Sequence, residues 1–225
     1  SINRSSLVLL FLAIIVFSST FLLTSRVLRL IIANKLLKIH NFKPQNVKNT
    51  MIDRLLAYIA PHHCYGCDTL GDPLCNNCQF NIISESPTTC IICKKPSMRG
   101  VFSSCIKAPF SQAWVVGERS GELEKLIDDF KFHRVKRALW VAAQLLDHTL
   151  PHFNSPVHIV PIPTIPKHIR LRGYDHMLMI ATYLTKNKHI SVCRMLERKD
   201  FSVQVGASKA TRKLQAKSAF VARIQ

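Results

Sequence analysis

Acidic side chains are scarce in this sequence, which holds 13 Asp and Glu against 31 Lys and Arg among 225 residues. The formal net charge is +18, and residues 151–225 contribute +10 of it. Residues 1–50 carry no acidic side chain at all. An excess of this sign suits polyphosphate ligands, nucleic acid or an anionic membrane surface, and charge alone does not choose among them.

Groups arranged for catalysis are also lacking. Three histidines, His133, His168 and His176, have no paired carboxylate or nucleophile at a recognisable spacing, so we interpret them as structural or surface residues. The one adjacent acidic pair, Asp128 and Asp129, falls in a helical pattern, where charged residues usually form a solvated face. The sequence therefore gives no catalytic residue.

Charge is absent from residues 7–23, a run of 17 residues at the lower limit for a bilayer-spanning helix. One basic residue precedes the run and several follow it, so a membrane anchor here would leave the remainder of the chain in the cytoplasm. No A-x-A-like cleavage site supports a signal peptide. The first Met is Met51, so residues 1–50 are interpreted either as a native extension or as upstream reading frame.

Cysteines are clustered: seven of the eight fall within 42 residues, and six of these form C-x2-C pairs. This spacing lets two thiolates point at one tetrahedral ion, so the sequence predicts a zinc site. Its ligands are Cys64, Cys67, Cys75 and Cys78. Four thiolates leave no open coordination position, and we expect Zn²⁺ to be structural. An iron–sulfur cluster stays open as an alternative.

Other cysteine chemistry fits less well. A disulfide framework requires an oxidising compartment, and a thioredoxin-type pair would begin a helix in a βαβ unit, whereas these pairs lie among Gly, Pro, Asp and Asn. A second metal site would use Cys90, Cys93 and Cys105 and is one ligand short. His62 or His63 could complete it, the site could be empty, or the pairs could interlock in a cross-brace.

The pattern after residue 110 is that of an α/β domain. The expected elements are a buried strand at 113–117, a helix capped by Ser120, a second helix from Val135, a strand at 157–163, a basic loop at 165–174 and a helix from Tyr174. This order predicts a parallel sheet with ligands bound beyond the carboxyl ends of its strands.

Several segments carry a family resemblance when they are taken in order. They are MIDRLLAYIAPHHCYGC from Met51, then PLCNNC, CIIC, FKFHR, VPIP, RLRGYDH and finally QVGASKATRKLQAKSAF, which ends at Phe220. Together they resemble the ComF family, competence-associated proteins made of a zinc ribbon and a type I phosphoribosyltransferase domain. The resemblance therefore covers residues 51–220.

The resemblance implies both an architecture and an activity. After the extension at 1–50, residues 51–108 would form a short helix and a cysteine-rich zinc ribbon, and residues 109–225 a phosphoribosyltransferase-like parallel-sheet domain. A nitrogen nucleophile would displace pyrophosphate from phosphoribosyl pyrophosphate, with Mg²⁺ bridging the diphosphate. The phosphate-binding residues would be Lys131, Arg170, Arg172 and Gly173. The partners would be the competence machinery, in the cytoplasm.

One part of the family pattern is not found. The family's phosphoribosyl-pyrophosphate loop is an acidic pair followed by T-T-G-x-T, and none of the seven glycines lies in such a context. Backbone N–H groups of that turn would cradle the 5'-phosphate. We therefore expect an incomplete domain that is inactive alone, and we expect Mg²⁺ with phosphoribosyl pyrophosphate only where that loop is present.

A second function is open for the same reason. The chain could be a non-catalytic adaptor of the DNA-uptake machinery that binds single-stranded DNA or a partner protein through its zinc ribbon and its basic last third. Aromatic residues are few after residue 150, so a base-stacking platform is not evident. A membrane partner is expected only if residues 7–23 are native.

Overall fold

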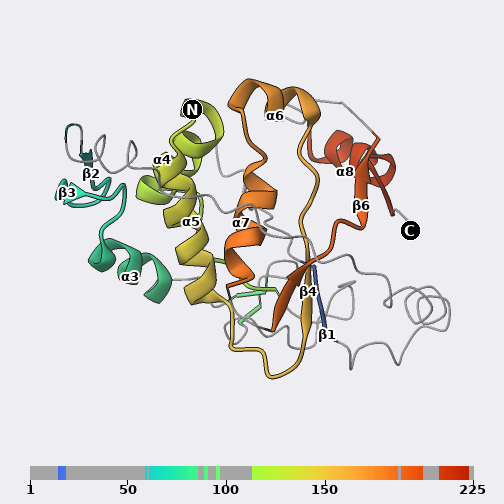
Figure 1. Cartoon of the computed structure of the whole chain (residues 1–225), viewed down its shortest axis with the longest axis horizontal. Coiled ribbons are helices and arrows are strands. Elements are labelled where there is room, and N and C mark those ends of the chain that lie inside the picture. Colours follow the sequence, from blue (N-terminus) through green and yellow to red (C-terminus); the bar gives the residue numbers. More distant parts are fainter. Residues whose placement is uncertain are drawn as a thin grey trace. The chain divides into compact units, whose positions relative to one another are not determined.

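The computed structural model describes residues 15–18, 59, 61–85, 89–90, 95–96, 113–186, 189–199 and 208–222. These residues form a mixture of helices and short strands (Figure 1). They group into two compact units: the described residues from 59 to 152 belong to the first, and residues 15–18 with those from 153 to 222 belong to the second. The predicted boundary at 108–109 lies outside the described residues and stays a prediction.

The first unit combines the cysteine-rich segment with a group of helices. Its described elements are the paired strands β2 (His62–His63) and β3 (Leu70–Gly71), followed by α3 (Asn76–Ser84), α4 (Gly121–Asp128), the π-helical turn η3 (Asp129–His133) and α5 (Lys136–Thr149). Helix α5 packs against α3, α4 and η3. The cysteine-rich segment and these helices therefore share one core.

Apolar spacing explains the helices of this unit. Leu123, Leu126, Ile127 and Phe130 form one stripe along α4 and η3, and all four are buried. Along α5 the buried residues are Ala138, Leu139, Val141, Ala142, Ala143, Leu145 and Leu146. The predicted helix beginning after Ser120 is confirmed, although the Ser120 side chain makes no capping hydrogen bond.

The second unit contains a small mixed sheet in the order β1, β4, β5. Its strands are β1 (Ile15–Ser18), β4 (Val157–Val160) and β5 (Ile190–Val192). β4 pairs in parallel with β5 and antiparallel with β1. Between β4 and β5 the chain forms α6 (Pro166–Arg172) and α7 (His176–Leu184), and α7 packs on β5. The predicted strand at VHIV, the predicted helix after Tyr174 and a parallel α/β pairing are therefore confirmed.

The other described elements of the second unit are a pair of antiparallel strands and a basic helix between them in the chain. Strand β6 (Leu196–Arg198) pairs antiparallel with β7 (Phe220–Ala222), and α8 (Lys209–Ser218) precedes β7. Ser208 caps α8 by accepting a hydrogen bond from the Thr211 N–H at 3.1 Å. Among the described residues, the β6–β7 pair forms a sheet of its own and is not hydrogen-bonded to the β1–β4–β5 sheet.

Two predicted elements are wrong. Residues 113–117 form no strand and are half-buried, because an apolar run specifies burial without specifying a pairing partner. Residues 166–172 form helix α6 in place of a basic loop. Pro166, the first residue of α6, has the φ that a helix needs, and Gly173 ends the helix with a left-handed φ of 83°. These end signals are enough to form a short helix without an apolar stripe.

The N-terminal segments are described only in part. Residues 15–18 of the predicted spanning run form strand β1 and no helix there, and the remainder of 7–23 lies outside the described residues. Of the predicted helix that begins at Met51, only Ile59 is described; it is helical and exposed. Within the portion of the chain that the structure describes, no helix combines the length and the apolar character needed to cross a bilayer.

Candidate metal centre

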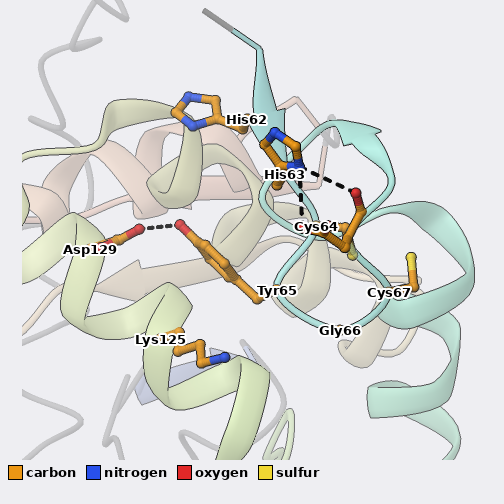
Figure 2. A pocket seen from close by; sticks show the side chains of 9 residues that line it. His62, His63, Cys64, Tyr65, Gly66, Cys67, Lys125 and Asp129 are labelled. Carbon is orange, nitrogen blue, oxygen red and sulfur yellow. Dashed lines mark hydrogen bonds and ion pairs between the residues drawn. The ribbon is translucent and has the colours of Figure 1, made fainter.

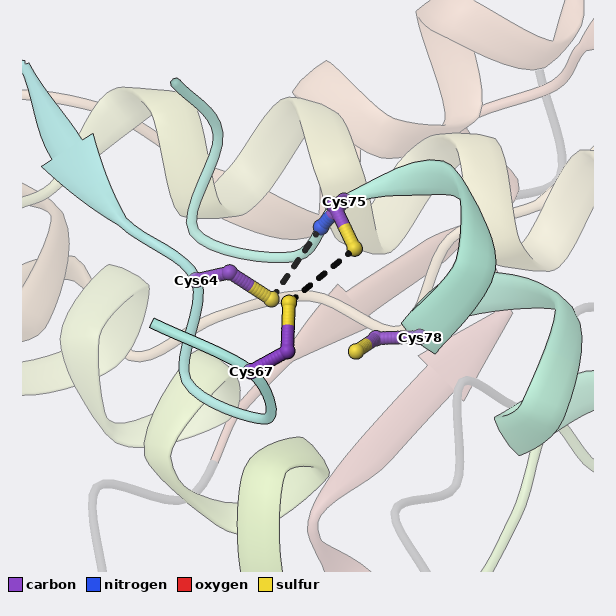
Figure 3. A group of neighbouring side chains, drawn as sticks. All are labelled: Cys64, Cys67, Cys75 and Cys78. Carbon is purple, nitrogen blue, oxygen red and sulfur yellow. Dashed lines mark hydrogen bonds between the residues drawn. The ribbon is translucent and has the colours of Figure 1, made fainter. Parts of the chain in front are cut away.

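Four sulfur atoms converge at one end of the first unit. The Sγ atoms of Cys64, Cys67, Cys75 and Cys78 all lie within 4.8 Å of one another. Figure 3 shows the first two on a loop that faces the second two at the start of α3. Four thiolates around a tetrahedral zinc, with Zn–S bonds of 2.3 Å, lie about 3.8 Å apart. The donor set therefore fits a metal ion such as zinc.

The first pair of ligands is carried by a closed turn. The Cys64 N–H donates to the Thr69 carbonyl and the Asp68 N–H donates to the Cys64 carbonyl, both at 2.9 Å. The turn bends at Asp68, which has a φ of 60°. On either side of it, His63 pairs with Leu70 and His62 with Gly71. These hydrogen bonds hold the backbone between the first two ligands in a tight turn.

The second pair is set by the start of a helix. Cys75 occupies the N-cap position of α3, and Cys78 lies in the first turn. Residues three apart on a helix lie on the same face, which directs both sulfurs toward the loop. Behind them, the buried Gln79 side chain donates to the Leu74 carbonyl at 2.8 Å, and Leu74 is fully buried. The entry to α3 is therefore anchored in the core.

The four thiols lie in different electrostatic surroundings. Burial would raise the pKa of Cys64, but backbone N–H groups of Cys75, Cys67 and Gly66 lower it to about 6. A hydrogen bond with the Thr69 hydroxyl lowers the pKa of Cys67. Burial and the neighbouring sulfurs raise the pKa of Cys78. N–H groups aimed at a sulfur stabilise the thiolate form that metals require.

A second C-x2-C segment has the same backbone register as the first. The Cys90 N–H donates to the Lys95 carbonyl at 2.8 Å, as Cys64 does to Thr69. Thr89 also bridges Pro96, as His63 pairs with Leu70. Cys90 is buried, whereas Cys93 and Cys105 lie outside the described residues. A second metal site therefore stays a prediction, as does its completion by His62 or His63.

An open pocket of about 570 Å³ lies beside the first cysteine loop. Figure 2 shows His62, His63 and Tyr65 on the loop side, with Lys125 and Asp129 on the helix side. His63 Nδ1 lies 3.2 Å from an Asp68 carboxylate oxygen, so this histidine already has a partner.

Tyr65 and Asp72 connect the cysteine loops to the helices. The Tyr65 hydroxyl donates a hydrogen bond to Asp129, the first residue of η3. Asp72, which lies between Cys67 and Cys75, pairs with Arg137 in the first turn of α5. Burial and the Asp129 carboxylate raise the pKa of Tyr65, so its hydroxyl stays a donor. Each cysteine loop therefore has its own side-chain contact to the helical group.

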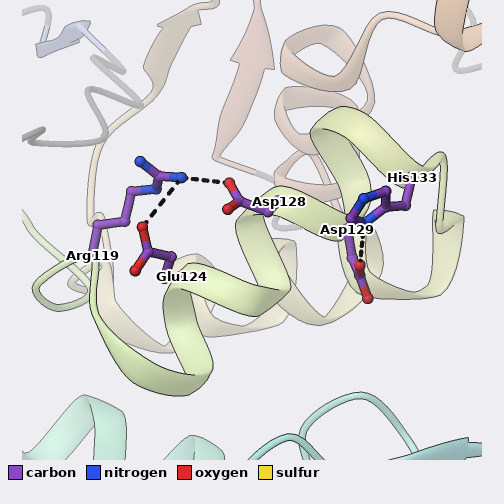
Figure 4. Close-up of polar contacts among 5 residues, drawn as sticks. All are labelled: Arg119, Glu124, Asp128, Asp129 and His133. Atoms are coloured by element: carbon purple, nitrogen blue, oxygen red, sulfur yellow. Dashed lines mark hydrogen bonds and ion pairs between the residues drawn. The ribbon is translucent and has the colours of Figure 1, made fainter.

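The acidic pair is more than a solvated face, and that interpretation was wrong. Arg119 Nη2 lies 2.5 Å from Asp128 and 3.4 Å from Glu124 (Figure 4). Asp129 Oδ1 accepts from His133 Nδ1 at 2.7 Å, and its other oxygen accepts from Tyr65. The Asp128 and Asp129 side chains are 33% and 25% exposed, so both are partly buried as well as paired.

The predicted phosphate-binding residues fall in both units. Lys131 is in η3 of the first unit, while Arg170 and Arg172 end α6 in the second unit and Gly173 caps it. Arg170 is exposed. Arg172 is half-buried and donates from Nη1 to His176 Nδ1 at 2.9 Å, so it already supports the start of α7. A joint anion site of these four residues stays a prediction.

The three histidines that we interpreted as structural or surface residues differ in burial and in their charged neighbours. His133 is exposed and His176 is buried against Arg172, as expected of surface and structural residues. His168 is half-buried in α6, and its pKa is lowered by burial and then by the charges of Arg172, Arg198 and Lys167. The positive charges of these three residues therefore favour the neutral form of the His168 imidazole.

Sequence reasoning missed Tyr65, Asp72 and Gly66. A Cβ on Gly66 would lie 2.8 Å from the Cys78 sulfur and 3.2 Å from Glu122, so only glycine fits between the two ligand pairs. The only signal for these residues was their position between the metal ligands. Comparison with protein-family models, with curated proteins and with solved structures gives no match for this chain.

Proposed function

We propose that this chain is a ComF-like protein of the phosphoribosyltransferase family, associated with competence and DNA uptake, in which a zinc ribbon stabilises the fold. The observation that carries the proposal is the convergence of four cysteine sulfurs within 4.8 Å. The ordered motifs from Met51 to Phe220 supply the family, and the parallel pairing of β4 with β5 supports its α/β part.

The ligands Cys64, Cys67, Cys75 and Cys78 would hold Zn²⁺ in a closed tetrahedral site. Such a site binds no substrate and contributes folding free energy. The backbone N–H groups that donate to Cys64 would stabilise its thiolate, and the Thr69 hydroxyl would stabilise that of Cys67. Because the same thiolate set suits an iron–sulfur cluster, the metal has to be identified by experiment.

Metal analysis tests this first part of the proposal. Protein purified without added metal should contain about one zinc per chain, and Cys75→Ser with Cys78→Ser should abolish it. Cys193→Ser is the matched control, since Cys193 lies in the second unit near β5 and should leave the zinc content unchanged. Iron with visible absorption, or no metal at all, would contradict the zinc assignment.

The transferase activity is the second part of the proposal. In parallel α/β sheets, ligands bind beyond the carboxyl ends of the strands, and α6 with its basic residues follows the carboxyl end of β4. Exposed Arg170 would contact the pyrophosphate oxygens. The phosphoribosyl-pyrophosphate loop is not among the 225 residues, so we do not assign transfer to these residues alone.

Titration calorimetry with Mg²⁺ and phosphoribosyl pyrophosphate tests the transferase part. This chain should show no heat of binding, whereas a chimera continued through the family's acidic pair and T-T-G-x-T segment should bind. Arg170→Gln in the chimera should weaken binding about tenfold, in line with the loss of one charge-assisted contact. A chimera that folds with zinc and still fails to bind would contradict the transferase proposal.

A DNA-binding adaptor is a second candidate function, and one observation favours it. The charges of Arg172, Arg198 and Lys167 all lower the pKa of His168 in addition to its burial, which indicates positive potential in the second unit, as binding of a phosphate backbone requires. Single-stranded DNA should then bind with an affinity that falls steeply with salt. Lys167→Gln with Arg170→Gln should reduce the salt slope by about 1 to 2, whereas unchanged affinity would contradict the adaptor function.

A further inference from the structure

Asp129 makes both side-chain and backbone contacts that close the π-helical turn η3. Asp129 is its first residue, and Oδ1 of Asp129 accepts from Nδ1 of His133, its last residue, at 2.7 Å. The Asp129 carbonyl also accepts from the N–H groups of Arg134 and Val135, the latter at 3.1 Å. A π turn is rare because α-helical hydrogen bonding competes with it, so this turn depends on such local contacts.

Strain at the end of η3 makes that dependence stronger. Arg134 follows the turn with a φ of 63°, in the left-handed region that costs a non-glycine residue free energy. Conversion of the π turn to α-helical hydrogen bonding would remove this requirement. Because one residue of an α-helix turns the chain by about 100°, such a conversion would point Lys131 in a different direction. An α-helical arrangement of the same residues is therefore the alternative against which the contacts of Asp129 act.

The contact that favours the π-helical arrangement comes from the metal loop. Tyr65 follows the ligand Cys64 directly, and its hydroxyl donates to the Asp129 oxygen that His133 does not use. The backbone of Tyr65 is also fixed, because its N–H donates to the Pro73 carbonyl at 2.9 Å, two residues before the ligand Cys75. The tyrosine is thus held by segments that carry both ligand pairs.

We propose that Tyr65 transmits metal occupancy of the cysteine cluster to η3, so that a bound metal holds Lys131 in its π-helical position. The proposal rests on the metal centre proposed above, and it makes Tyr65 a positioning residue. Without the ion, the two ligand loops are no longer joined through a common atom, and the Tyr65 hydroxyl loses its fixed position. The chain then gains freedom at Asp129, where the π turn begins.

The structure also supplies a matched control. Asp72 connects the same metal loops to Arg137 in the first turn of α5. Loss of that ion pair removes a second contact between the metal loops and the helices but keeps the hydrogen bond from Tyr65 to Asp129, so η3 should loosen less than it does when the Tyr65 hydroxyl is removed. Tyr65→Phe, in contrast, keeps the ring and all four cysteines and removes only the hydroxyl that Asp129 accepts from.

Amide hydrogen exchange of the full chain, measured by mass spectrometry, tests the proposal. In the zinc-loaded protein, Tyr65→Phe should raise exchange over residues 129–135 about tenfold, the effect of one hydrogen bond to a charged group. Removing zinc from the unmodified chain with a chelator should do the same. Arg137→Gln with zinc bound should raise exchange over residues 129–135 clearly less than Tyr65→Phe does, and β4 serves as a reference for global unfolding.

A second readout follows Lys131 itself. Acylation of the Lys131 amine, located by mass spectrometry, should change at least threefold on zinc removal and in Tyr65→Phe. Unchanged exchange at 129–135 and unchanged Lys131 labelling in zinc-loaded Tyr65→Phe would overturn the proposal. If the unmodified chain binds no zinc, the proposed metal centre fails. If zinc binds and η3 does not respond, only the coupling through Tyr65 fails.

Discussion

The backbone of Gly66 passes so close to the Cys78 sulfur that no side-chain atom fits between them. Because a Cβ at this position would lie 2.8 Å from the Cys78 sulfur, Gly66→Ala should displace that ligand and weaken zinc binding about 10- to 100-fold. Competition with a chromogenic chelator measures the change. The control is Gly71→Ala, which meets nothing within 4 Å and has a φ of 136°. It should lower stability by about 1 kcal/mol and leave the zinc affinity unchanged.

His168 offers a second test at the residue scale. Its pKa is lowered by burial and by Arg172, Arg198 and Lys167, so the fold favours the neutral imidazole. The unfolded chain then takes up the proton first as pH falls. This contribution to the free energy of unfolding is present above the ordinary histidine pKa of about 6.5 and is lost below it.

A proton NMR titration of the His168 imidazole measures this effect. We expect a midpoint below that of a free histidine, and Arg198→Gln should move the midpoint upward. Burial lowers the pKa of Arg172, and Tyr174 and Asp175 oppose that shift. Because the ordinary arginine pKa lies about six units above that of histidine, Arg172 stays charged throughout the titration. A midpoint that does not respond to Arg198→Gln would contradict the contribution of Arg198 to the lowered His168 pKa.

At the scale of elements, two helices begin in contrasting ways. Asp175 caps α7 with a carboxylate oxygen that accepts from the N–H groups of Met177 and Leu178 at 3.1 and 3.3 Å, and from the Thr164 hydroxyl at 3.0 Å. Ser120 precedes α4 and makes no side-chain capping bond. The two positions therefore separate the effect of a cap from that of a residue change.

Asp175→Ala should lower the free energy of unfolding by about 1 to 2 kcal/mol, since it removes the cap and the Thr164 contact. Asp175→Asn should restore most of that loss, because an amide oxygen also accepts from backbone N–H groups. Ser120→Ala should cost only a few tenths of a kcal/mol, below the usual cost of a capping residue. Urea denaturation curves give all three values, and equal losses for Asp175→Ala and Ser120→Ala would contradict the assignment.

At the scale of the whole molecule, metal and fold should be linked through the first unit. Both tryptophans of the chain, Trp114 and Trp140, belong to it, so tryptophan fluorescence follows its unfolding. Zinc at a free concentration 1,000 times its dissociation constant should stabilise this unit by about 4 kcal/mol. A chelator should lower the fluorescence midpoint accordingly, and a midpoint that ignores both zinc and chelator would remove the structural role of the site.

The sequence predicts the parts of this structure that depend on local patterns. Cysteine spacing located the four-sulfur cluster, and apolar periodicity located α4, α5, α7 and β4. Helix α6 was mistaken for a loop because its signals lie at its ends, in Pro166 and Gly173, and not in an apolar stripe. Tyr65 and Asp129 are 64 residues apart, so no local pattern pairs them. Their contact requires the tertiary fold.

The unequal burial of the four sulfurs has a kinetic consequence. Cys64 is buried, Cys75 and Cys78 are half-buried, and Cys67 is exposed. An incoming chelator must therefore first replace Cys67 in the coordination shell while the other three thiolates still hold the ion. Zinc loss should be first order in chelator concentration and faster for small chelators than for large ones. Alkylation of Cys67 alone removes one of the four thiolates, so zinc should then leave rapidly, where before it left slowly and only with the help of the chelator.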